Sequence, residues 1–467
     1  MSFVGRETEL RALQQRYDSK QFEMCVLYGR RRVGKTSLIN WFCRDKATIF
    51  FSALEGSEED NLRALSSTIM QFDGFAGEAN AAPTFPSLQA AFAQVFDLAE
   101  RRRLIFVIDE YPYLQRACPK AASLLQHLID KRKESSGLFL IVNGSAISQM
   151  QKQFLDGAAP LYGRQTMQME VKPLQFADLC AYFPKLDRDG VARVYGAYGG
   201  IPKYLEFYQT GHSYASNLEN SFLQPGAALL GEPENVLRQE LRDPATYNTV
   251  LTAIAGGSHK YSEISSKSRL TSGNLVAVLK TLELLGLVQR VVPPLAATTK
   301  QVLYQVKDNM FRFWYRFIPS RLSLINAGKS ALALPGIIEG IDQFMGPVFE
   351  QICLEWLWRQ DGTAGLPLVF EQAGRWWGNN PERKCQEEID ILAYNQDGQA
   401  LFCECKWSKK LVGSDILEEL RRKSQLPQFS AFPEKSFMLF ARKGFTAGCL
   451  QLAENDPALT LVDLQSM

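Results

Sequence analysis

Residues 29–36 read Gly-Arg-Arg-Arg-Val-Gly-Lys-Thr, which has the spacing G-x-x-x-x-G-K-[ST]. They directly follow the apolar run 24–28 and precede a helical pattern. In that context the glycines let backbone N–H groups wrap phosphate oxygens, and the N-terminus of the helix adds its dipole. Lys35 would pair with the β and γ phosphates, and Thr36 would ligate Mg²⁺. The residues predicted to form this phosphate site are Gly29, Arg30, Arg31, Arg32, Val33, Gly34, Lys35, Thr36 and Ser37.

A pair of carboxylates completes this chemistry. The apolar run 104–108 ends in Asp109 and Glu110, and nucleotides bind outside the carboxyl ends of strands in such sheets. Because adjacent carboxylates repel, we expect each to have a role. Asp109 would hold Mg²⁺ through water, and Glu110 would polarise the attacking water. Together with the phosphate loop, the pair predicts a nucleoside triphosphatase.

A second set of charged residues lies in an apolar context further along the chain. The stretches LFCECKW, residues 401–407, and EEIDILAY, residues 387–394, both read as strands. Between them, NQDG at 395–398 has Asn first and Gly fourth, as in a type I turn. A Gly in the left-handed region then makes a three-residue hairpin loop with a bulge, which pairs Asn395 with Gln399.

Counting outward along this hairpin puts Asp390 opposite Glu404, with Lys406 on the same face. Two carboxylates facing each other at about 5 Å repel, and partial burial raises the cost unless a cation lies between them. This is the constellation of a PD-(D/E)xK nuclease, in which Asp390 and Glu404 would ligate Mg²⁺ and Lys406 would stabilise the attacking hydroxide or the pentavalent phosphate. A carboxylate on the preceding helix is also usual; Glu350 fits, and Glu355 is the alternative. Otherwise Glu404 and Lys406 form a minor ion pair on a solvent-facing strand.

The elements that position these residues follow from the hydrophobic pattern. Between residues 24 and 171, continuous apolar runs alternate with amphipathic segments, which predicts a parallel sheet covered on both faces. From residue 176 to 235 the pattern is helical, with breaks at 199–202 and 225–226, and predicts a lid. Residues 243–308 show three helices followed by two strands, which is the order of a winged helix.

The predicted fold class is therefore α/β: a P-loop parallel sheet with a helical lid, then a winged helix, then a restriction-endonuclease-like α/β domain. The predicted domains are a P-loop core at 1–175, a helical lid at 176–238, a winged helix at 239–308, a connector at 309–339 and a nuclease-like domain at 340–467.

The order of these blocks also carries a resemblance. The opening FVGRETEL, residues 3–10, resembles the hhGRExE element of STAND-type ATPases of the AAA+ lineage, and YGGIP, residues 198–202, resembles their GxP lid motif. Over nearly the whole chain the arrangement resembles the archaeal ATPase family, in which a winged helix is followed by a C-terminal region catalogued as a domain of unknown function. The resemblance implies that ATP is the nucleotide, with Mg²⁺, and that the core hydrolyses ATP to ADP and phosphate.

Further site residues are implied by the resemblance. Gly5, Arg6 and Glu7 would lie near the base and ribose of the nucleotide. Pro202, in the lid motif, would pack against adenine.

The resemblance also implies a polar sensor of the γ-phosphate and an arginine finger. The segment IVNGSAIS, residues 141–148, follows a strand, so either Asn143 or Ser145 would be the sensor. The segment PLYGRQT resembles the family's PLYGR segment, which makes Arg164 a candidate finger. A plain surface ion pair explains Arg164 equally well, because an exposed arginine needs no special role.

The third helix of the predicted winged helix, residues 272–287, is the element that such folds place in the DNA major groove. Its polar residues and the cations beside it suit phosphate contacts better than base reading. A structural winged helix, which relays nucleotide state or binds another protein, is equally compatible. The residues concerned are Ser272, Asn274, Lys280 and Thr281, with Lys260, Lys267 and Arg269 flanking them.

Composition limits the remaining possibilities. The 467 residues are 46% hydrophobic and 22% charged, which is enough to bury a core in each of several domains. The net charge of +2 does not by itself indicate a nucleic-acid binder. Nine cysteines without a CxxC pair argue against a disulfide framework and a zinc site. The charged N-terminus and the lack of a long apolar run predict a cytoplasmic protein without a membrane helix.

From these observations we expect an ATP-hydrolysing protein that couples nucleotide state to DNA binding or to metal-dependent DNA cleavage. One alternative is an ATP-dependent switch or scaffold, which assembles a protein partner or a homo-oligomer and whose nuclease-like domain does not cut. The other is a winged-helix transcription regulator.

Overall fold

The computed structural model describes residues 3–78, 82–154, 156–296, 301–363 and 365–467. The chain forms two compact units. The first comprises Met1–Pro173 with Ile201–Lys203, and the second comprises Leu174–Gly200 with Tyr204–Met467.

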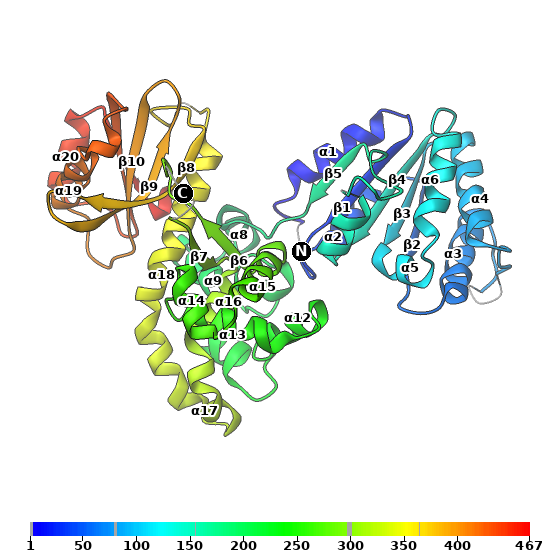
Figure 1. Ribbon diagram of the computed structural model, residues 1–467, viewed down its shortest axis with the longest axis horizontal. Coiled ribbons are helices and arrows are strands. Elements are labelled where there is room, and N and C mark those ends of the chain that lie inside the picture. Colours follow the sequence, from blue (N-terminus) through cyan, green and yellow to red (C-terminus); the bar gives the residue numbers. More distant parts are fainter. Residues whose placement is uncertain (1–2, 79–81, 155, 297–300, 364) are drawn as a thin grey trace. The chain divides into compact units, whose positions relative to one another are not determined.

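Within the described residues, the first unit is built on a parallel five-stranded sheet in the order β2-β3-β4-β1-β5 (Figure 1). Every residue of β3 and β4 is buried, as expected for strands covered on both faces. The parallel sheet predicted from the sequence is confirmed. The strands are β1 (Glu23–Tyr28), β2 (Thr48–Ser52), β3 (Leu104–Asp109), β4 (Leu138–Gly144) and β5 (Met167–Glu170).

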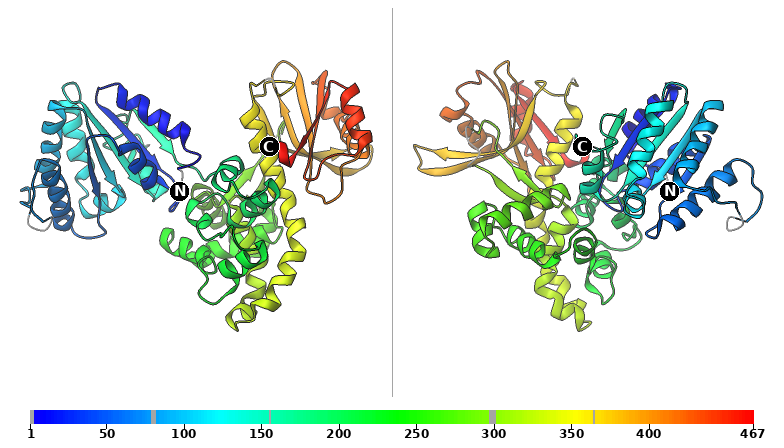
Figure 2. Two further views of the ribbon diagram at one scale, coloured as in Figure 1. Left: turned by 180° about the vertical axis from the view of Figure 1, so that it is seen from behind. Right: turned by 45° about the vertical axis from the view of Figure 1, so that its right-hand side comes forward.

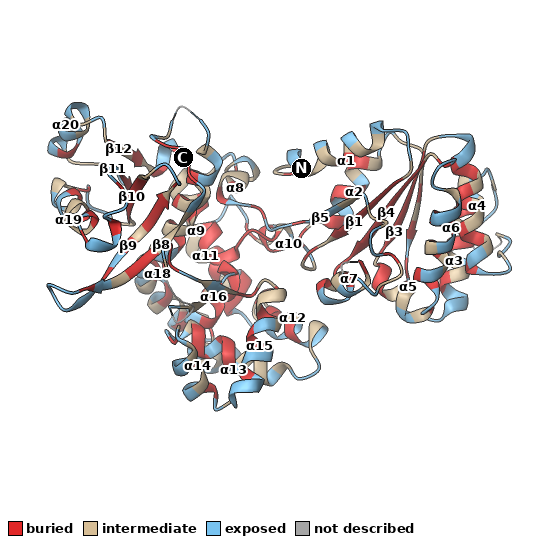
Figure 3. Cartoon of the chain, turned by 45° about the horizontal axis from the view of Figure 1, so that its top comes forward, coloured by how far each residue is buried: buried red, intermediate tan, exposed pale blue. Residues whose placement is uncertain are grey.

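Helices cover both faces of this sheet, and their buried sides meet it (Figure 3). Phe106 of β3 contacts Phe92 of α4, whereas Phe139 of β4 contacts Phe42 of α2. Phe106 lies in register with Leu140, the neighbour of Phe139. Because successive residues of a strand point to opposite faces, α4 and α2 lie on opposite sides. The helices of the unit are α1 (Glu7–Asp18), α2 (Lys35–Cys43), α3 (Glu58–Phe72), α4 (Leu88–Arg101), α5 (Tyr111–Ala117), α6 (Ala121–Arg132) and α7 (Ile147–Phe154).

The second unit begins with helices, as the sequence pattern predicts for the lid. Asp187 caps the first turn of α9 by accepting a hydrogen bond from the backbone of Gly190 at 2.8 Å, which fixes where that helix starts. The helical elements are α8 (Phe176–Tyr182), α9 (Arg188–Tyr198), α10 (Pro202–Leu205), α11 (Tyr214–Leu218), the π-helical turn η2 (Glu219–Leu223) and α12 (Glu232–Glu240). The short α10 spans the boundary between the two units.

Three helices and a hairpin follow in the order expected of a winged helix. The two strands pair antiparallel, with Val288 opposite Val306. Leu251 of the first helix, Ile264 of the second and Leu279 of the third are buried. The elements are α13 (Pro244–Ala255), α14 (Tyr261–Ser268), α15 (Ser272–Leu284), β6 (Val288–Val291) and β7 (Leu303–Val306).

The predicted connector at 309–339 is mostly helical, and its first part, residues 309–318, is largely buried. Its aromatic residues pack inside the unit because Phe313 lies 5.0 Å from Phe222 and 5.8 Å from Phe344 between ring centroids. The predicted boundary at residue 340 falls inside one continuous helix. Among the described residues, no helix combines the length and apolar character needed to cross a membrane. These elements are α16 (Asn309–Phe317), η3 (Pro319–Arg321), α17 (Leu322–Asn326) and α18 (Ser330–Gln360).

The C-terminal part contains a mixed sheet in the order β12-β11-β10-β9-β8. β8, β9 and β10 run antiparallel to one another, whereas β10, β11 and β12 are parallel. β8 and β9 extend as a long hairpin beyond the other strands (Figure 2). The elements are β8 (Gln372–Asn380), β9 (Cys385–Tyr394), β10 (Gln399–Lys406), α19 (Ser414–Ser424), η4 (Pro427–Phe429), β11 (Glu434–Ala441), α20 (Ala447–Asn455), β12 (Leu459–Asp463) and η5 (Leu464–Ser466).

A charged network joins this sheet to the helices of the second unit. Arg442, which follows β11 and is 5% exposed, pairs with Asp189 of α9 and lies 3.3 Å from Asp342 of α18. Arg193 of α9 contacts the same two carboxylates, at 3.1 and 3.3 Å. The Arg442 guanidinium also lies 4.4 Å from the ring centroid of Trp407, directly after β10. Removing one partner from such a network leaves a buried charge uncompensated.

The glycine pair of the lid motif gives a test of the fold. A Cβ on Gly200 would lie 1.9 Å from the carbonyl oxygen of Leu174, while the Leu174 amide donates to the Gly200 carbonyl at 2.8 Å. We expect Gly200→Ala to destabilise the second unit by about 2 kcal/mol or more, lowering its melting temperature by about 4 °C or more. Gly211→Ala, which meets nothing within 4 Å, is the control. Equal melting temperatures in differential scanning calorimetry would contradict this role of Gly200.

Candidate functional site

The phosphate loop joins β1 to α2 and needs glycine at both ends. Gly29 has φ 152°, and a Cβ there would lie 2.5 Å from the carbonyl oxygen of Val171. Gly34 has φ 95° and caps α2 in the left-handed region, which glycine enters at little cost. The backbone therefore takes the turn that the sequence motif predicts, and α2 begins directly after it.

Lys35 brings a buried positive charge to this loop. It is the first residue of α2 and is 5% exposed. Its ammonium group donates to the carbonyl oxygens of Gly29 at 2.9 Å and Arg30 at 3.0 Å. A lysine held across a helix N-terminus suits an anionic phosphate group, because the charge and the helix dipole act in the same direction.

Asp109, at the end of β3, connects the loop to the neighbouring strand. The Thr36 hydroxyl donates to its carboxylate at 3.1 Å, and the Asn143 amide donates to it from β4. Burial raises the pKa of Asp109, although these hydrogen bonds oppose the effect. Among the described residues, Oδ1 of Asn143 is a buried acceptor without a hydrogen-bond partner. These hard oxygen donors fit Mg²⁺ together with its water ligands.

Glu110 is held apart from Asp109 by the backbone. Its φ of 51° and ψ of 46° place it in the left-handed region, as the cap of α5. Such a conformation is unfavourable for glutamate and is tolerated where the surrounding structure requires it. The Glu110 carboxylate accepts hydrogen bonds from the Ser145 hydroxyl at 2.9 Å and from its backbone N–H at 3.3 Å. Thus Asn143 and Ser145, between which the sequence does not discriminate, each contact a different carboxylate.

The residues expected near the base and ribose lie beside the same loop. Arg6 is buried, and it donates to the carbonyl oxygen of Val33 and to Glu9, each at 3.0 Å. A Cβ on Gly34 would lie 3.8 Å from the ring of Pro202. Arg6 therefore supports the loop backbone, a contact that the sequence motif did not predict.

Gly5 and Glu7, the other two predicted residues of the opening motif, lie at the start of α1. Gly5 has φ 70°, in the left-handed region. Glu7 is the exposed first residue of α1.

Arg164, the candidate arginine finger, forms a two-point ion pair in the structure. Its guanidinium donates to both carboxylate oxygens of Asp130, at 2.8 and 2.7 Å. It also donates to the carbonyl oxygen of Pro160 at 2.9 Å. This geometry corresponds to the ion-pair alternative of the sequence analysis.

The hairpin register predicted from the NQDG turn is the one observed. Gly398 has φ 81°, and β10 pairs with β9 from Ala400 opposite Tyr394 to Cys403 opposite Ile391. The next step along this register brings Asp390 beside Glu404. Asp390 accepts a hydrogen bond from the backbone of Cys405 at 2.8 Å.

Two lysines lie against Glu404, which is 9% exposed. Lys406 contacts one carboxylate oxygen at 2.5 Å, and Lys423 of α19 lies 3.5 Å from the other. Although burial opposes it, Glu404 raises the pKa of Lys406, which keeps the ammonium charged. Lys423 is not among the residues that the sequence analysis singled out.

Glu350 of α18 belongs to this acidic cluster, which we define as Glu350, Asp390 and Glu404. Burial and then Asp390 raise the pKa of Glu350, while burial and then Glu404 raise the pKa of Asp390. Glu355, the alternative, lies elsewhere: it accepts hydrogen bonds from the Tyr195 hydroxyl at 2.7 Å and the Phe176 backbone at 3.1 Å. The structure therefore distinguishes two carboxylates that the sequence left open.

A further cation near the cluster was not predicted. Arg375 of β8 is paired with Glu388, and it lowers the pKa of Glu350 against the effect of burial. No sequence signal marked it, because it is brought to the cluster by the pairing of β8 with β9.

The acidic cluster offers few side-chain ligands for a metal ion. Within the described ranges, no group of three or more His, Cys, Asp or Glu residues is arranged to hold one. Mg²⁺ commonly binds proteins through one or two carboxylates and retains several waters. Asp390 and Glu404 would meet that requirement as two carboxylate ligands.

The basic residues of α19 are already paired inside the domain. Arg421 pairs with Asp456, Arg422 with Glu387 at 2.8 Å, and Lys423 with Glu404. These ion pairs leave fewer cations of this helix available for contact with phosphate groups. In contrast, Asn274 and Lys280 of α15 are exposed.

Two family models match the chain. Residues 3–207 match the model described as "ATPase domain predominantly from Archaea". Residues 314–422 match the model described as "Archaea bacterial proteins of unknown function".

Similar proteins were found among curated sequences and solved structures. The uncharacterized protein MJECL04 of Methanocaldococcus jannaschii is 33% identical over 446 residues, covering 94% of this chain and 96% of that protein. The uncharacterized ATP-binding protein MJ0423 of the same organism is 46% identical over 44 residues, which are 9% of this chain and 75% of that protein.

A solved structure, the Walker-type ATPase PABY2304 of Pyrococcus abyssi, matches with a TM-score of 0.51 and 22% identity, covering 67% of this chain and 96% of that one. This likeness shows the fold. The identity to MJECL04 extends over nearly the full length of both chains. The chain therefore belongs to the archaeal ATPase family, with an N-terminal ATPase domain and a C-terminal domain of unknown function.

Proposed function

We propose that the first unit binds ATP with Mg²⁺ and hydrolyses it. The observation that carries this proposal is the convergence of the phosphate loop with the ends of β3 and β4. There the Thr36 hydroxyl reaches Asp109, and Ser145 reaches Glu110. The match of residues 3–207 to an ATPase domain supports it.

Each residue has a separate task in this proposal. The backbone of the loop and Lys35 hold the phosphates, and Thr36 and Asp109 hold Mg²⁺, which neutralises developing charge when bound. Glu110 orients the attacking water and polarises it. Asn143 and Ser145 hold the two carboxylates in place, and one of the two senses the γ-phosphate. Gly5, Arg6, Glu7 and Pro202 border the base.

We further propose that the C-terminal sheet binds a divalent cation and cleaves DNA. The acidic cluster supports this, because burial raises the pKa of Glu350 and of Asp390, and a cation bound beside them would favour their charged forms. Asp390 and Glu404 would hold Mg²⁺, which supplies a Lewis acid at the phosphate. Lys406 remains cationic beside them and stabilises negative charge on the hydroxide or the phosphate.

DNA is the proposed partner of the three-helix block. Lys260, Lys267 and Arg269 around α14 and α15 would contact the backbone phosphates. Such binding weakens as salt rises, because phosphate contacts release counterions.

A second candidate is a nucleotide switch whose C-terminal domain binds a protein partner or a further copy of the chain without cutting. The pairing of Arg421, Arg422 and Lys423 within the domain favours it, because fewer cations remain for a nucleic acid. The third candidate, a winged-helix transcription regulator, would need DNA binding without cleavage.

The ATPase proposal is tested by Lys35→Ala and Glu110→Gln. We expect each to lower ATP hydrolysis by about 100-fold or more, because each removes a group that acts on the transition state. Glu110→Gln keeps the shape of the side chain and should retain ATP binding. Glu59→Gln, an exposed position on α3, serves as the control. Wild-type turnover in Glu110→Gln would remove this residue from catalysis.

The role of Arg164 is tested by comparing two variants that break the same ion pair. We expect Arg164→Ala and Asp130→Ala to hydrolyse saturating ATP at equal rates, because an exposed pair contributes at most about 1 kcal/mol. An arginine finger contributes about 10³-fold or more. A large loss in Arg164→Ala alone would therefore establish a finger.

The nuclease proposal is tested on plasmid and linear DNA with Mg²⁺ or Mn²⁺. We expect cleavage by the wild type and none by Asp390→Ala or Lys406→Ala, while ATP turnover persists. Since the pKa values of Glu350 and Asp390 are raised, protons compete with the cation on acidification, and cleavage should rise with pH.

Glu418→Ala, at an exposed position of α19, is the control for the cleavage assays. If the wild type cuts no substrate while it hydrolyses ATP, the switch replaces the nuclease.

A further inference from the structure

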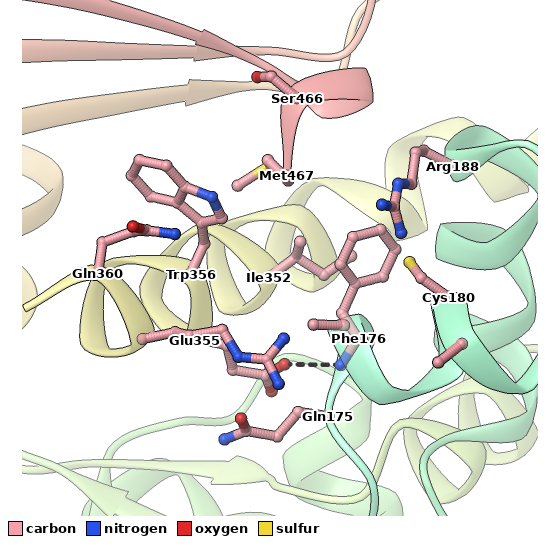
Figure 4. Close-up of a pocket in the computed structure, with 13 residues that line it drawn as sticks. Gln175, Phe176, Cys180, Arg188, Ile352, Glu355, Trp356, Gln360, Ser466 and Met467 are labelled. Atoms are coloured by element: carbon pink, nitrogen blue, oxygen red, sulfur yellow. Dashed lines mark hydrogen bonds between the residues drawn. The ribbon is translucent and has the colours of Figure 1, made fainter. Parts of the chain in front are cut away.

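The second unit contains a cavity of about 450 Å³ (Figure 4), and its lining includes no residue of the acidic cluster. It lies between α8, the first turn of α9, the last turns of α18 and the residues of η5. Its volume is within the range of about 300–1,000 Å³ typical of small-molecule sites.

Apolar side chains from three elements form the walls. Phe176 of α8 and Ile352 of α18 are buried, and Trp356 is half-buried. Figure 4 shows Trp356 and Phe176 rising from their helices toward Met467, which follows η5. Two aromatic rings and a thioether offer contacts to a planar apolar group.

The charged side chains of the lining are Arg188, Arg359 and Glu355. Arg188, the first residue of α9, contacts the thiol of Cys180 and has no carboxylate partner among the residues that the structure describes. Arg359 is half exposed, and its contact with Asp178 is long, at 3.5 Å.

Glu355, an acidic side chain of the lining, is hydrogen-bonded to other groups of the protein. Its carboxylate accepts hydrogen bonds from Tyr195, from the Phe176 backbone and, at 2.9 Å, from Gln351. Burial raises its pKa in spite of these bonds. Among the described residues, Glu355 forms no ion pair with Arg188.

We propose that this cavity binds a small organic anion with a planar, apolar body. The acid group of the ligand pairs with Arg188, and its body packs against Phe176 and Trp356. The charge complementarity favours an anion over a neutral molecule, since a guanidinium facing an apolar cavity lacks a counterion. Arg188 and Trp356 lie on different elements, so a bound anion contacts α9 and α18 together.

The first test uses two dyes that differ in charge. 1-Anilinonaphthalene-8-sulfonate is an aromatic anion, and N-phenyl-1-naphthylamine has the same ring system without the sulfonate. By fluorescence titration of the full chain, we expect Arg188→Gln to weaken the anionic dye about 10-fold and the neutral dye hardly at all. Arg188→Lys should restore part of the loss, and Trp356→Ala should weaken both dyes. Arg238→Gln, at an exposed position of α12, is the control.

The second test locates the dye within the chain. Cys180 lines the cavity, whereas Cys385 is exposed on β9. Each cysteine is alkylated with iodoacetate or with iodoacetamide, and the extent of alkylation is measured by peptide mass spectrometry. We expect Arg188→Gln to lower the ratio of iodoacetate to iodoacetamide reaction at Cys180 and to leave the ratio at Cys385 unchanged. The anionic dye should protect Cys180 alone.

Two results would overturn the proposal. The first is an equal effect of Arg188→Gln on both dyes, which would show a merely hydrophobic cavity. The second is alkylation of Cys180 that the anionic dye does not slow, which would place the dye elsewhere. A melting curve like that of the wild type confirms that each variant is folded.

Discussion

The central constraint of the C-terminal domain is the electrostatic repulsion between carboxylates that lie close together and are largely shielded from water. Glu350, Asp390 and Glu404 are brought together by α18, β9 and β10, and burial together with mutual repulsion raises the pKa of the first two. Lys406 and Lys423 form ion pairs with Glu404 and partly compensate its charge. An apolar strand pair would be simpler and more stable without these groups. Their presence is explained if the domain holds a divalent cation, since the clustered carboxylates that repel one another would each attract the cation.

The first unit resolves a similar conflict by geometry. Asp109 and Glu110 are adjacent in sequence, but the left-handed conformation of Glu110 directs them to different partners. Asp109 contacts Thr36 and Asn143, and Glu110 contacts Ser145. Adjacent carboxylates thereby become two separate functional groups, one suited to a metal and the other to a water molecule. In the second unit, the network of Arg442 ties the C-terminal sheet to α9 and α18.

The features that could be predicted from the sequence are those set by residues close together in the chain. The phosphate loop, the parallel sheet and the NQDG turn follow from glycine positions and apolar runs, and the turn alone sets the register that brings Asp390 beside Glu404. Contacts made through tertiary packing were not predictable. Arg6 supports the loop, Lys423 contacts Glu404, and Arg164 is paired with Asp130, because helices or strands distant in sequence meet. The first part of the predicted connector is the buried helix α16, because the aromatic residues that suggested a connector form part of a core.

The most direct test of the account is a count of bound Mn²⁺. The nucleotide-free full chain would be titrated with Mn²⁺ near pH 8, and the free ion would be measured by electron paramagnetic resonance. The account predicts a site that is present in the wild type and in Lys35→Ala and lost in Asp390→Asn, since the cation joins Asp390 to Glu404. An absence of bound Mn²⁺ in the wild type, or equal binding by Asp390→Asn, would contradict it.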